Sequence, residues 1–164
     1  MIRNPILKGF NPDPSIIRIK DDFYIATSTF EWFPGVQIHH SRDLKHWRLL
    51  TRPLSRVSQL DINGVDDSMG IWAPCLSFDN GTYYLTYTVV KSVRGGYMDA
   101  QNFLVTSNKI DGDWSEPVFL NRIGFDPSLF HDNDGRKWFV GLTRENSPGH
   151  SKFGGIVLQE YSIE

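Results

Sequence analysis

The chain has 164 residues, 40% of them apolar and 22% charged, which is the composition of one globular domain with a sizeable core, and disorder is not expected. Its 17 basic and 19 acidic residues give a formal net charge of −2 and are spread along the sequence. Without a cationic run to contact phosphates or anionic lipids, no nucleic-acid or membrane partner is expected.

The first residues, Met1-Ile2-Arg3-Asn4-Pro5, lack the apolar segment of a secretory signal. No later stretch approaches the roughly 18 uninterrupted apolar residues of a membrane-spanning helix. The single cysteine, Cys75, cannot form an internal disulfide. These features predict a cytoplasmic protein.

In chain order, short β-prone runs occupy residues 23–27, 36–39, 82–88 and 137–142, and Gly, Asp, Asn and Pro separate them. Phe, Trp and Tyr make up 13% of the chain, beside 14 glycines and 9 prolines, which favours strands and tight turns. Nothing between the runs keeps an apolar 3.6-residue period for three turns. The sequence therefore predicts an all-β chain.

One unit is repeated along the sequence, opening with a strand start, then a polar turn, then an aromatic strand. The three strand starts are Asp13-Pro14-Ser15-Ile16, Ala73-Pro74-Cys75-Leu76 and Asp126-Pro127-Ser128-Leu129. They follow one another after 60 and then 53 residues. A repeat of about 50 residues built from short strands is typical of a β-propeller blade, and a β-sandwich with similar hairpins is the alternative.

A fourth unit would open at about position 181 on this spacing. Residues 1–164 therefore hold under three blades, and we expect an incomplete propeller. Since a propeller protects its sheet edges by closing the ring, further chain, a completing chain or a second copy would be needed.

Two acids share the first position of the repeat, which reads Asp13, Ala73 and Asp126. The innermost strands of a propeller run beside its axis, so these carboxylates should face a common pocket. Each is followed by proline, which disfavours helical backbone in the preceding residue and predicts an extended conformation there. The alternative is a local Asx turn in which each aspartate satisfies only backbone donors.

A pair of carboxyl groups at a pocket is the machinery of glycoside hydrolysis. Sugar rings also bury their C–H faces on aromatic side chains, and Phe30 and Trp72 are the candidates for such a pocket wall. The histidines show no metal-ligand spacing, and Asp132-Asn133-Asp134-Gly135 lies where each repeat has a turn, so neither a metal nor a cofactor is expected.

The chain resembles glycoside hydrolase family 43, and within it the bacterial β-xylosidases. The resemblance covers nearly the whole chain and rests on four segments in order: Asn11-Pro12-Asp13-Pro14-Ser15, Ser28-Thr29-Phe30-Glu31-Trp32-Phe33-Pro34-Gly35-Val36, Ile71-Trp72-Ala73-Pro74 and Gly124-Phe125-Asp126-Pro127-Ser128-Leu129-Phe130-His131-Asp132.

This resemblance implies a five-bladed propeller and an inverting β-xylosidase or α-arabinofuranosidase acting on xylo-oligosaccharides or arabinosides. By motif, Asp13 would be the general base and Asp126 would orient the general acid and tune its pKa. Phe30, Trp72 and Ala73 would line the subsite of the terminal sugar. The alternatives are a non-catalytic sugar-binding or structural propeller fragment and a retaining, fructosidase-like propeller enzyme.

The family's general acid is a glutamate in a Thr-Glu-Gly-Pro-like motif at the start of the fourth blade, and residues 1–164 contain no such motif. Neither Glu145 nor Glu160 has a matching context. The carboxy-terminal β-sandwich of the subgroup is also absent. The isolated chain is therefore expected to have little or no glycosidase activity.

Overall fold

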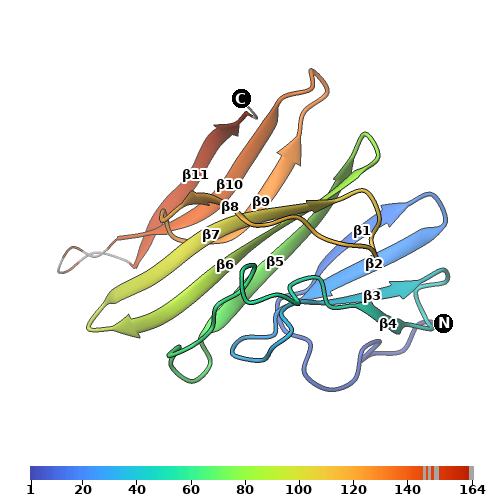
Figure 1. Ribbon diagram of the computed structural model, residues 1–164, viewed down its shortest axis with the longest axis horizontal. Coiled ribbons are helices and arrows are strands. Elements are labelled where there is room, and N and C mark those ends of the chain that lie inside the picture. The colour runs from blue at the N-terminus through green and yellow to red at the C-terminus, as the bar shows by residue number, and fades with distance from the viewer. Residues whose placement is uncertain (146, 148, 150–151, 163–164) are drawn as a thin grey trace.

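The computed structural model describes residues 1–145, 147, 149 and 152–162, and consists of strands that form three antiparallel sheets in chain order (Figure 1). None of the described residues belongs to a helix that could cross a lipid bilayer. The first sheet contains β1 (Ser15–Ile19), β2 (Asp22–Thr27), β3 (Gln37–Ser41) and β4 (Arg48–Thr51). The second contains β5 (Gly70–Asp79), β6 (Thr82–Arg94), β7 (Tyr97–Ser107) and β8 (Val118–Asn121). The third contains β9 (Phe125–His131), β10 (Lys137–Arg144) and β11 (Phe153–Tyr161).

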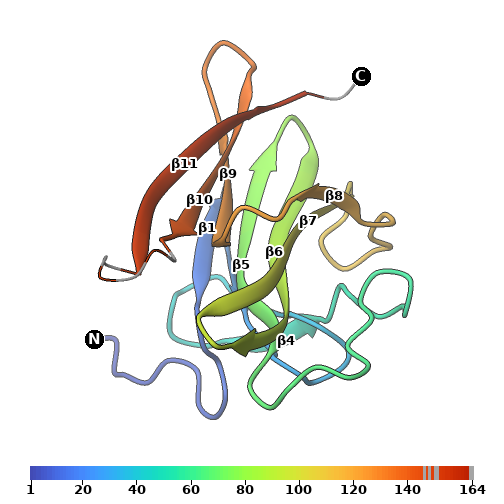
Figure 2. The ribbon, with the colours of Figure 1, turned by 90° about the vertical axis from the view of Figure 1, so that its left-hand side faces the viewer.

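Each sheet is a meander whose first strand lies on the inner side. Strand β5 contacts β1 on one side and β9 on the other, so the three inner strands are neighbours and the sheets fan outward from them (Figures 1 and 2). This is the arrangement of consecutive propeller blades, and the third has three described strands. The prediction of an all-β chain with under three propeller blades is confirmed.

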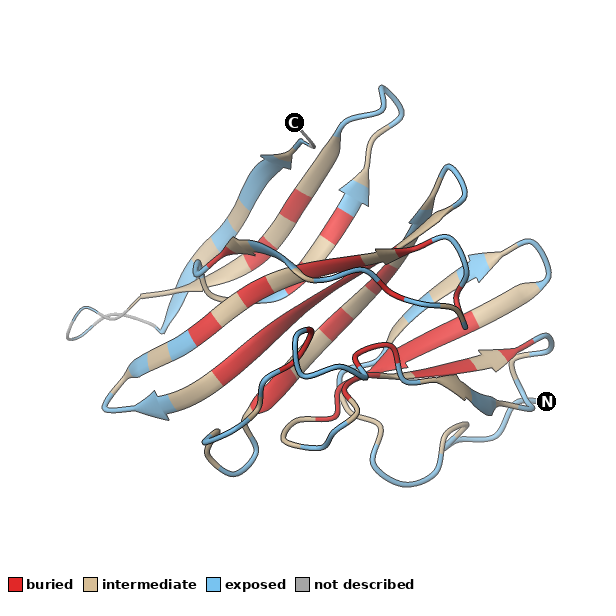
Figure 3. Ribbon diagram, in the orientation of Figure 1, coloured by how far each residue is buried: buried red, intermediate tan, exposed pale blue. Residues whose placement is uncertain are grey.

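The middle blade is covered on both faces because it lies between the other two. Its strand β6 is rich in aromatic and β-branched residues, and seven consecutive positions, 84–90, are buried (Figure 3). By contrast, β11 exposes large apolar side chains, including Ile156 at 65% and Leu158 at 62%. The cores therefore lie between blades one and two and, more thinly, between blades two and three.

A β-bulge opens the inner strand of the second and third blades. In blade two, Ala73-Pro74 of β5 lies opposite the single residue Tyr87 of β6. In blade three, Asp126-Pro127 of β9 lies opposite the single residue Gly141 of β10. The extra residue is not paired with the neighbouring strand, so its side chain departs from the regular alternation between the two faces of the sheet.

Blade one has the same geometry just before β1. The backbone amide of Ser28 donates to the carbonyl of Pro12 over 3.0 Å, and the regular pairing of β1 starts at Ser15. Asp13-Pro14 therefore lies opposite Thr27 alone. We call the residue before each proline, namely Asp13, Ala73 and Asp126, the bulge position of its blade.

The predicted extended conformation at the bulge positions is wrong. The φ angles are 50° at Asp13, 37° at Ala73 and 57° at Asp126, all in the left-handed region that costs a non-glycine residue roughly 1–2 kcal/mol. Proline disfavours helical backbone before it, but the bulge must also redirect the strand, and this second requirement decides the conformation. The three strand starts that align in the sequence therefore share the same strained backbone conformation at the bulge position.

Candidate active site

The Asp13 side chain is exposed at the inner side of blade one and is held by one short hydrogen bond. The hydroxyl of Ser28, a fully buried residue, donates to Asp13 Oδ2 over 2.6 Å. The same hydroxyl oxygen accepts a hydrogen bond from the backbone amide of Ala73 over 2.9 Å. A chain of hydrogen bonds therefore runs from the bulge position of blade two to that of blade one.

Asp126 occupies the bulge position of blade three, and its carboxyl group is electrostatically coupled to Asp13. Although the residue reaches the surface, loss of hydration raises the pKa of Asp126, and the negative charge of Asp13 raises it further. The two carboxyl groups are more than a hundred positions apart in sequence but near each other in the fold. Asp126 therefore holds its proton to higher pH than an ordinary aspartate.

Four aromatic rings form a row beside the two aspartates. Phe10 meets Phe30 edge-on with ring centres 5.4 Å apart, Phe30 lies 6.3 Å from Trp72, and Trp72 meets Phe125 edge-on at 5.9 Å. This aromatic row, Phe10, Phe30, Trp72 and Phe125, connects the amino-terminal segment with all three blades. It includes both predicted wall residues, and it adds Phe10 and Phe125, which were not predicted.

Backbone contacts between blades one and two fix the middle of the aromatic row. Phe30 and Ile71 exchange two backbone hydrogen bonds of 3.1 and 3.0 Å. The approach requires glycine at position 70, where φ is +91° and an added Cβ would lie 2.7 Å from the Phe30 carbonyl carbon. The indole nitrogen of Trp72 donates to the carbonyl of Ser68 over 3.0 Å, which sets the orientation of this ring.

A buried polar network supports the segment that leads into Asp126. The hydroxyl of Thr88 donates to Asn102 Oδ1 over 2.7 Å, and Asn102 Nδ2 donates to Asn121 Oδ1 over 2.9 Å and to the Gly124 carbonyl over 3.4 Å. Thr88 and Asn102 are fully buried, so each bond satisfies a group that water cannot reach. The network links blade two to the chain two residues before Asp126.

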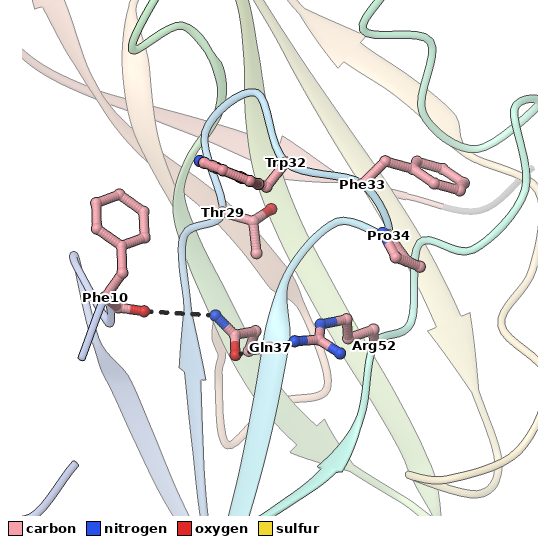
Figure 4. A pocket seen from close by; sticks show the side chains of 7 residues that line it. All are labelled: Phe10, Thr29, Trp32, Phe33, Pro34, Gln37 and Arg52. Carbon is pink, nitrogen blue, oxygen red and sulfur yellow. Dashed lines mark hydrogen bonds between the residues drawn. The ribbon is translucent and has the colours of Figure 1, made fainter. Parts of the chain in front are cut away.

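A cavity of about 630 Å³ in blade one shares Phe10 with the aromatic row and is lined by Thr29, the residue after Ser28 (Figure 4). Its apolar lining includes Trp32 and Phe33, which are 66% and 47% exposed. Figure 4 also shows the hydrogen bond from Gln37 to the Phe10 carbonyl, with Arg52 next to Gln37. Neither aspartate lines this cavity, so the cavity does not enclose the carboxyl pair.

The described residues contain no group of three or more His, Cys, Asp or Glu side chains that could hold a metal ion. The acidic segment Asp132-Asn133-Asp134-Gly135 forms the tight turn between β9 and β10, closed by a 3.1 Å bond from the Gly135 amide to the Asp132 carbonyl. Its interpretation as a turn is confirmed.

The sequence model of the family described as "Glycosyl hydrolases family 43" matches residues 2–164. The chain belongs to glycosyl hydrolases family 43. "Xylosidase/arabinosidase 43B" of Humicola insolens is 61% identical over 160 residues, which are 98% of this chain and 30% of that protein. "Beta-xylosidase" of Bacillus subtilis (strain 168) is 59% identical over 161 residues, again 98% of this chain and 30% of that protein.

A solved family 43 structure shows the same fold over the full chain. The xylan beta-1,4-xylosidase from Bacillus halodurans C-125 superposes with a TM-score of 0.97 and 63% identity, covering 99% of this chain and 31% of that one. The chain thus spans about 30% of the length of the relatives it matches. The solved family 43 neighbours are five-bladed β-propellers, and the three sheets of this chain correspond to under three of those blades.

Proposed function

We propose that residues 1–164 form part of a glycoside hydrolase that removes terminal xylose or arabinose from xylo-oligosaccharides with inversion at the anomeric carbon. The observation that carries this proposal is that Asp13 and Asp126 hold equivalent bulge positions in blades whose inner strands, β1 and β9, both contact β5 next to the aromatic row. Aromatic faces take the apolar face of a sugar ring, and paired carboxyl groups supply the acid and base chemistry.

In this proposal Asp13 is the general base. The Ser28 hydroxyl donates a hydrogen bond to Asp13 Oδ2, and this bond holds the carboxyl group that is proposed to act as the base. During inversion, Asp13 removes a proton from water as the water attacks the anomeric carbon from the face opposite the leaving group. Asp126, whose pKa is raised by burial and by the charge of Asp13, is proposed to orient and tune the general acid.

The general acid itself is proposed to come from outside residues 1–164, because this sequence has no Thr-Glu-Gly-Pro-like motif. We also propose that 1–164 is one part of a larger catalytic domain. Support comes from the exposed apolar side chains Ile156 and Leu158 of β11, which is the outer strand of the third sheet. In a closed ring such a face is covered by the next blade.

A second candidate function is sugar binding without catalysis. The aromatic row and the adjoining cavity favour it, since both present flat apolar surfaces with polar groups at the rim. The two functions differ in what replacing Asp13 would do. It would stop hydrolysis under the first function and leave sugar binding unchanged under the second.

The test replaces the matching part of the Bacillus halodurans xylosidase by residues 1–164, which are 63% identical to it. This chimera and the isolated chain are assayed on aryl β-xyloside and aryl α-arabinofuranoside. We expect the chimera to hydrolyse at least one of them and the isolated chain to show little or no turnover. In the chimera, Asp13→Asn should reduce kcat by about 10²- to 10⁴-fold, the usual worth of general base catalysis.

Asp21→Asn is the matched control, because Asp21 is an exposed aspartate in the same blade at the turn between β1 and β2. A chimera that binds xylose but does not hydrolyse either glycoside would favour the binding function. Proton NMR of the first sugar released from a β-xyloside separates mechanisms, since inversion gives α-xylose and a retaining enzyme gives β-xylose.

A further inference from the structure

Ser28 connects the two residues that the sequence motifs single out in blades one and two. We propose that Ser28 is the positioning residue of the Asp13 carboxylate, holding Oδ2 so that Oδ1 is presented to the attacking water. This inference rests on the proposed function, because it assigns a partner to the base of that reaction.

The direction of the hydrogen bonds follows from which groups can donate. The backbone amide of Ala73 can only donate, so the Ser28 oxygen must use a lone pair to accept it over 2.9 Å. The hydroxyl proton of Ser28 is then free for Asp13 Oδ2, 2.6 Å away. An amide that polarises a hydroxyl strengthens the bond that the hydroxyl donates, so blade two acts on the carboxylate through Ser28.

Ser28 holds the Asp13 segment at two points. Its side chain bonds to the carboxylate, and its backbone amide bonds to the carbonyl of Pro12 over 3.0 Å. Ser28 is fully buried, so water does not reach the donor of either bond. Within the described residues, Asp13 Oδ1 accepts no side-chain hydrogen bond, which leaves one oxygen held and the other available.

The third blade provides an internal comparison. Opposite the residue that precedes each bulge position, blade one has Ser28, whereas blade three has Leu142, which pairs with Phe125. The leucine side chain has no hydrogen-bond donor, so at this position Asp126 has no counterpart of the Ser28 hydroxyl. Two aspartates with the same backbone conformation are thereby given different surroundings, which matches the different roles proposed for them.

The kinetic test uses the chimera and three variants. Ser28→Ala should lower kcat about 10- to 100-fold with KM within about twofold, because the base is misplaced while the sugar-binding surfaces remain. Ser28→Thr keeps the hydroxyl and should recover most of this loss. Ser15→Ala is the control, because the Ser15 hydroxyl also accepts a backbone amide of blade two, that of Leu76 over 3.2 Å, and should leave kcat unchanged.

A wild-type kcat in Ser28→Ala, with Asp13→Asn still inactive, would overturn the role of Ser28 and leave the proposed function standing. Activity retained in Asp13→Asn would instead defeat the proposed function. Equal losses in Ser28→Ala and Ser15→Ala would also overturn the inference, since they would show a general need for contacts between blades.

A measurement on the unmodified 164-residue chain decides the matter if the alanine variant does not fold or the chimera is inactive. Proton NMR at low temperature should show a slowly exchanging Ser28 hydroxyl proton close to the Ala73 amide proton, and carbon–proton couplings should show one fixed χ1 rotamer of Asp13. An averaged Asp13 rotamer in the folded chain would overturn the inference.

Discussion

Replacing Gly124 by alanine should be among the most damaging small substitutions in the chain. Gly124 has φ of +71°, and an added Cβ would fall well inside contact distance of the Leu142 carbonyl oxygen and 2.7 Å from its carbonyl carbon. Left-handed backbone costs alanine roughly 1–2 kcal/mol. Forcing β9 away from β10 adds a further ~1–3 kcal/mol, as in other overpacked sites.

Gly135→Ala isolates the backbone contribution. Gly135 has φ of +88°, but an added Cβ would meet nothing within 4 Å, so only the conformational cost of about 1–2 kcal/mol applies. The free energy of unfolding should therefore fall by about 2–5 kcal/mol in Gly124→Ala and by clearly less in Gly135→Ala.

The assay is urea unfolding at pH 7 followed by tryptophan fluorescence. With an m-value of about 2 kcal/mol/M, the midpoint should fall by about 1–2.5 M for Gly124→Ala and by less than about 1 M for Gly135→Ala. Equal midpoints for the two variants would refute the reasoning, because they would show that the close approach to Leu142 carries no cost.

Three further predictions concern buried polar and titratable groups. Tyr87→Phe should lower the free energy of unfolding by about 1–3 kcal/mol, because the fully buried Tyr87 hydroxyl donates to the Gln59 carbonyl over 2.9 Å and that carbonyl would lose its partner; urea unfolding measures it. Burial, followed by the charge of Arg52, lowers the pKa of His39, so the unfolded chain binds this proton first and stability falls as the pH drops below about 6.5. Thermal unfolding between pH 5 and 8 should show a shallower loss in His39→Leu, and an unchanged slope would contradict the assignment. Because the pKa of Asp126 is raised in the folded chain, its contribution to stability is present at low pH and is lost as the pH rises through the folded value. Asp126→Asn should therefore melt higher than wild type at pH 7, by no more than about 4 °C given the screening of an exposed carboxyl, and equal melting temperatures at pH 7 would count against the coupling.

The repeat in the sequence was sufficient to predict the blades. Aromatic strands behind matching turns recur at a nearly constant interval. Since a blade cannot bury both faces without neighbouring blades, this interval indicates a propeller architecture. The nearness of Asp13 and Asp126 followed from the same reasoning, since equivalent residues of inner strands converge. Their roles in a reaction stay predictions.

The local backbone was harder to predict. Proline restricts the residue before it, but whether the strand bulges depends on its pairing with the next strand, which a single sequence does not show. Ser28 was not predicted as a partner of Asp13 either. Its hydroxyl has no periodic signal, and its two partners, Asp13 and Ala73, lie 15 residues before it and 45 residues after it. Phe125 was overlooked although it directly precedes Asp126.

Ala73 adopts the same left-handed backbone as the two aspartates while carrying only a methyl group. The conformation therefore belongs to the blade and does not require a carboxylate at that point. The backbone at these three sites stays the same whichever side chain it carries. A protein engineer could therefore introduce an acid into blade two by Ala73→Asp without redesigning the main chain. A ring of this kind could acquire or lose chemistry by single substitutions while its architecture stays the same.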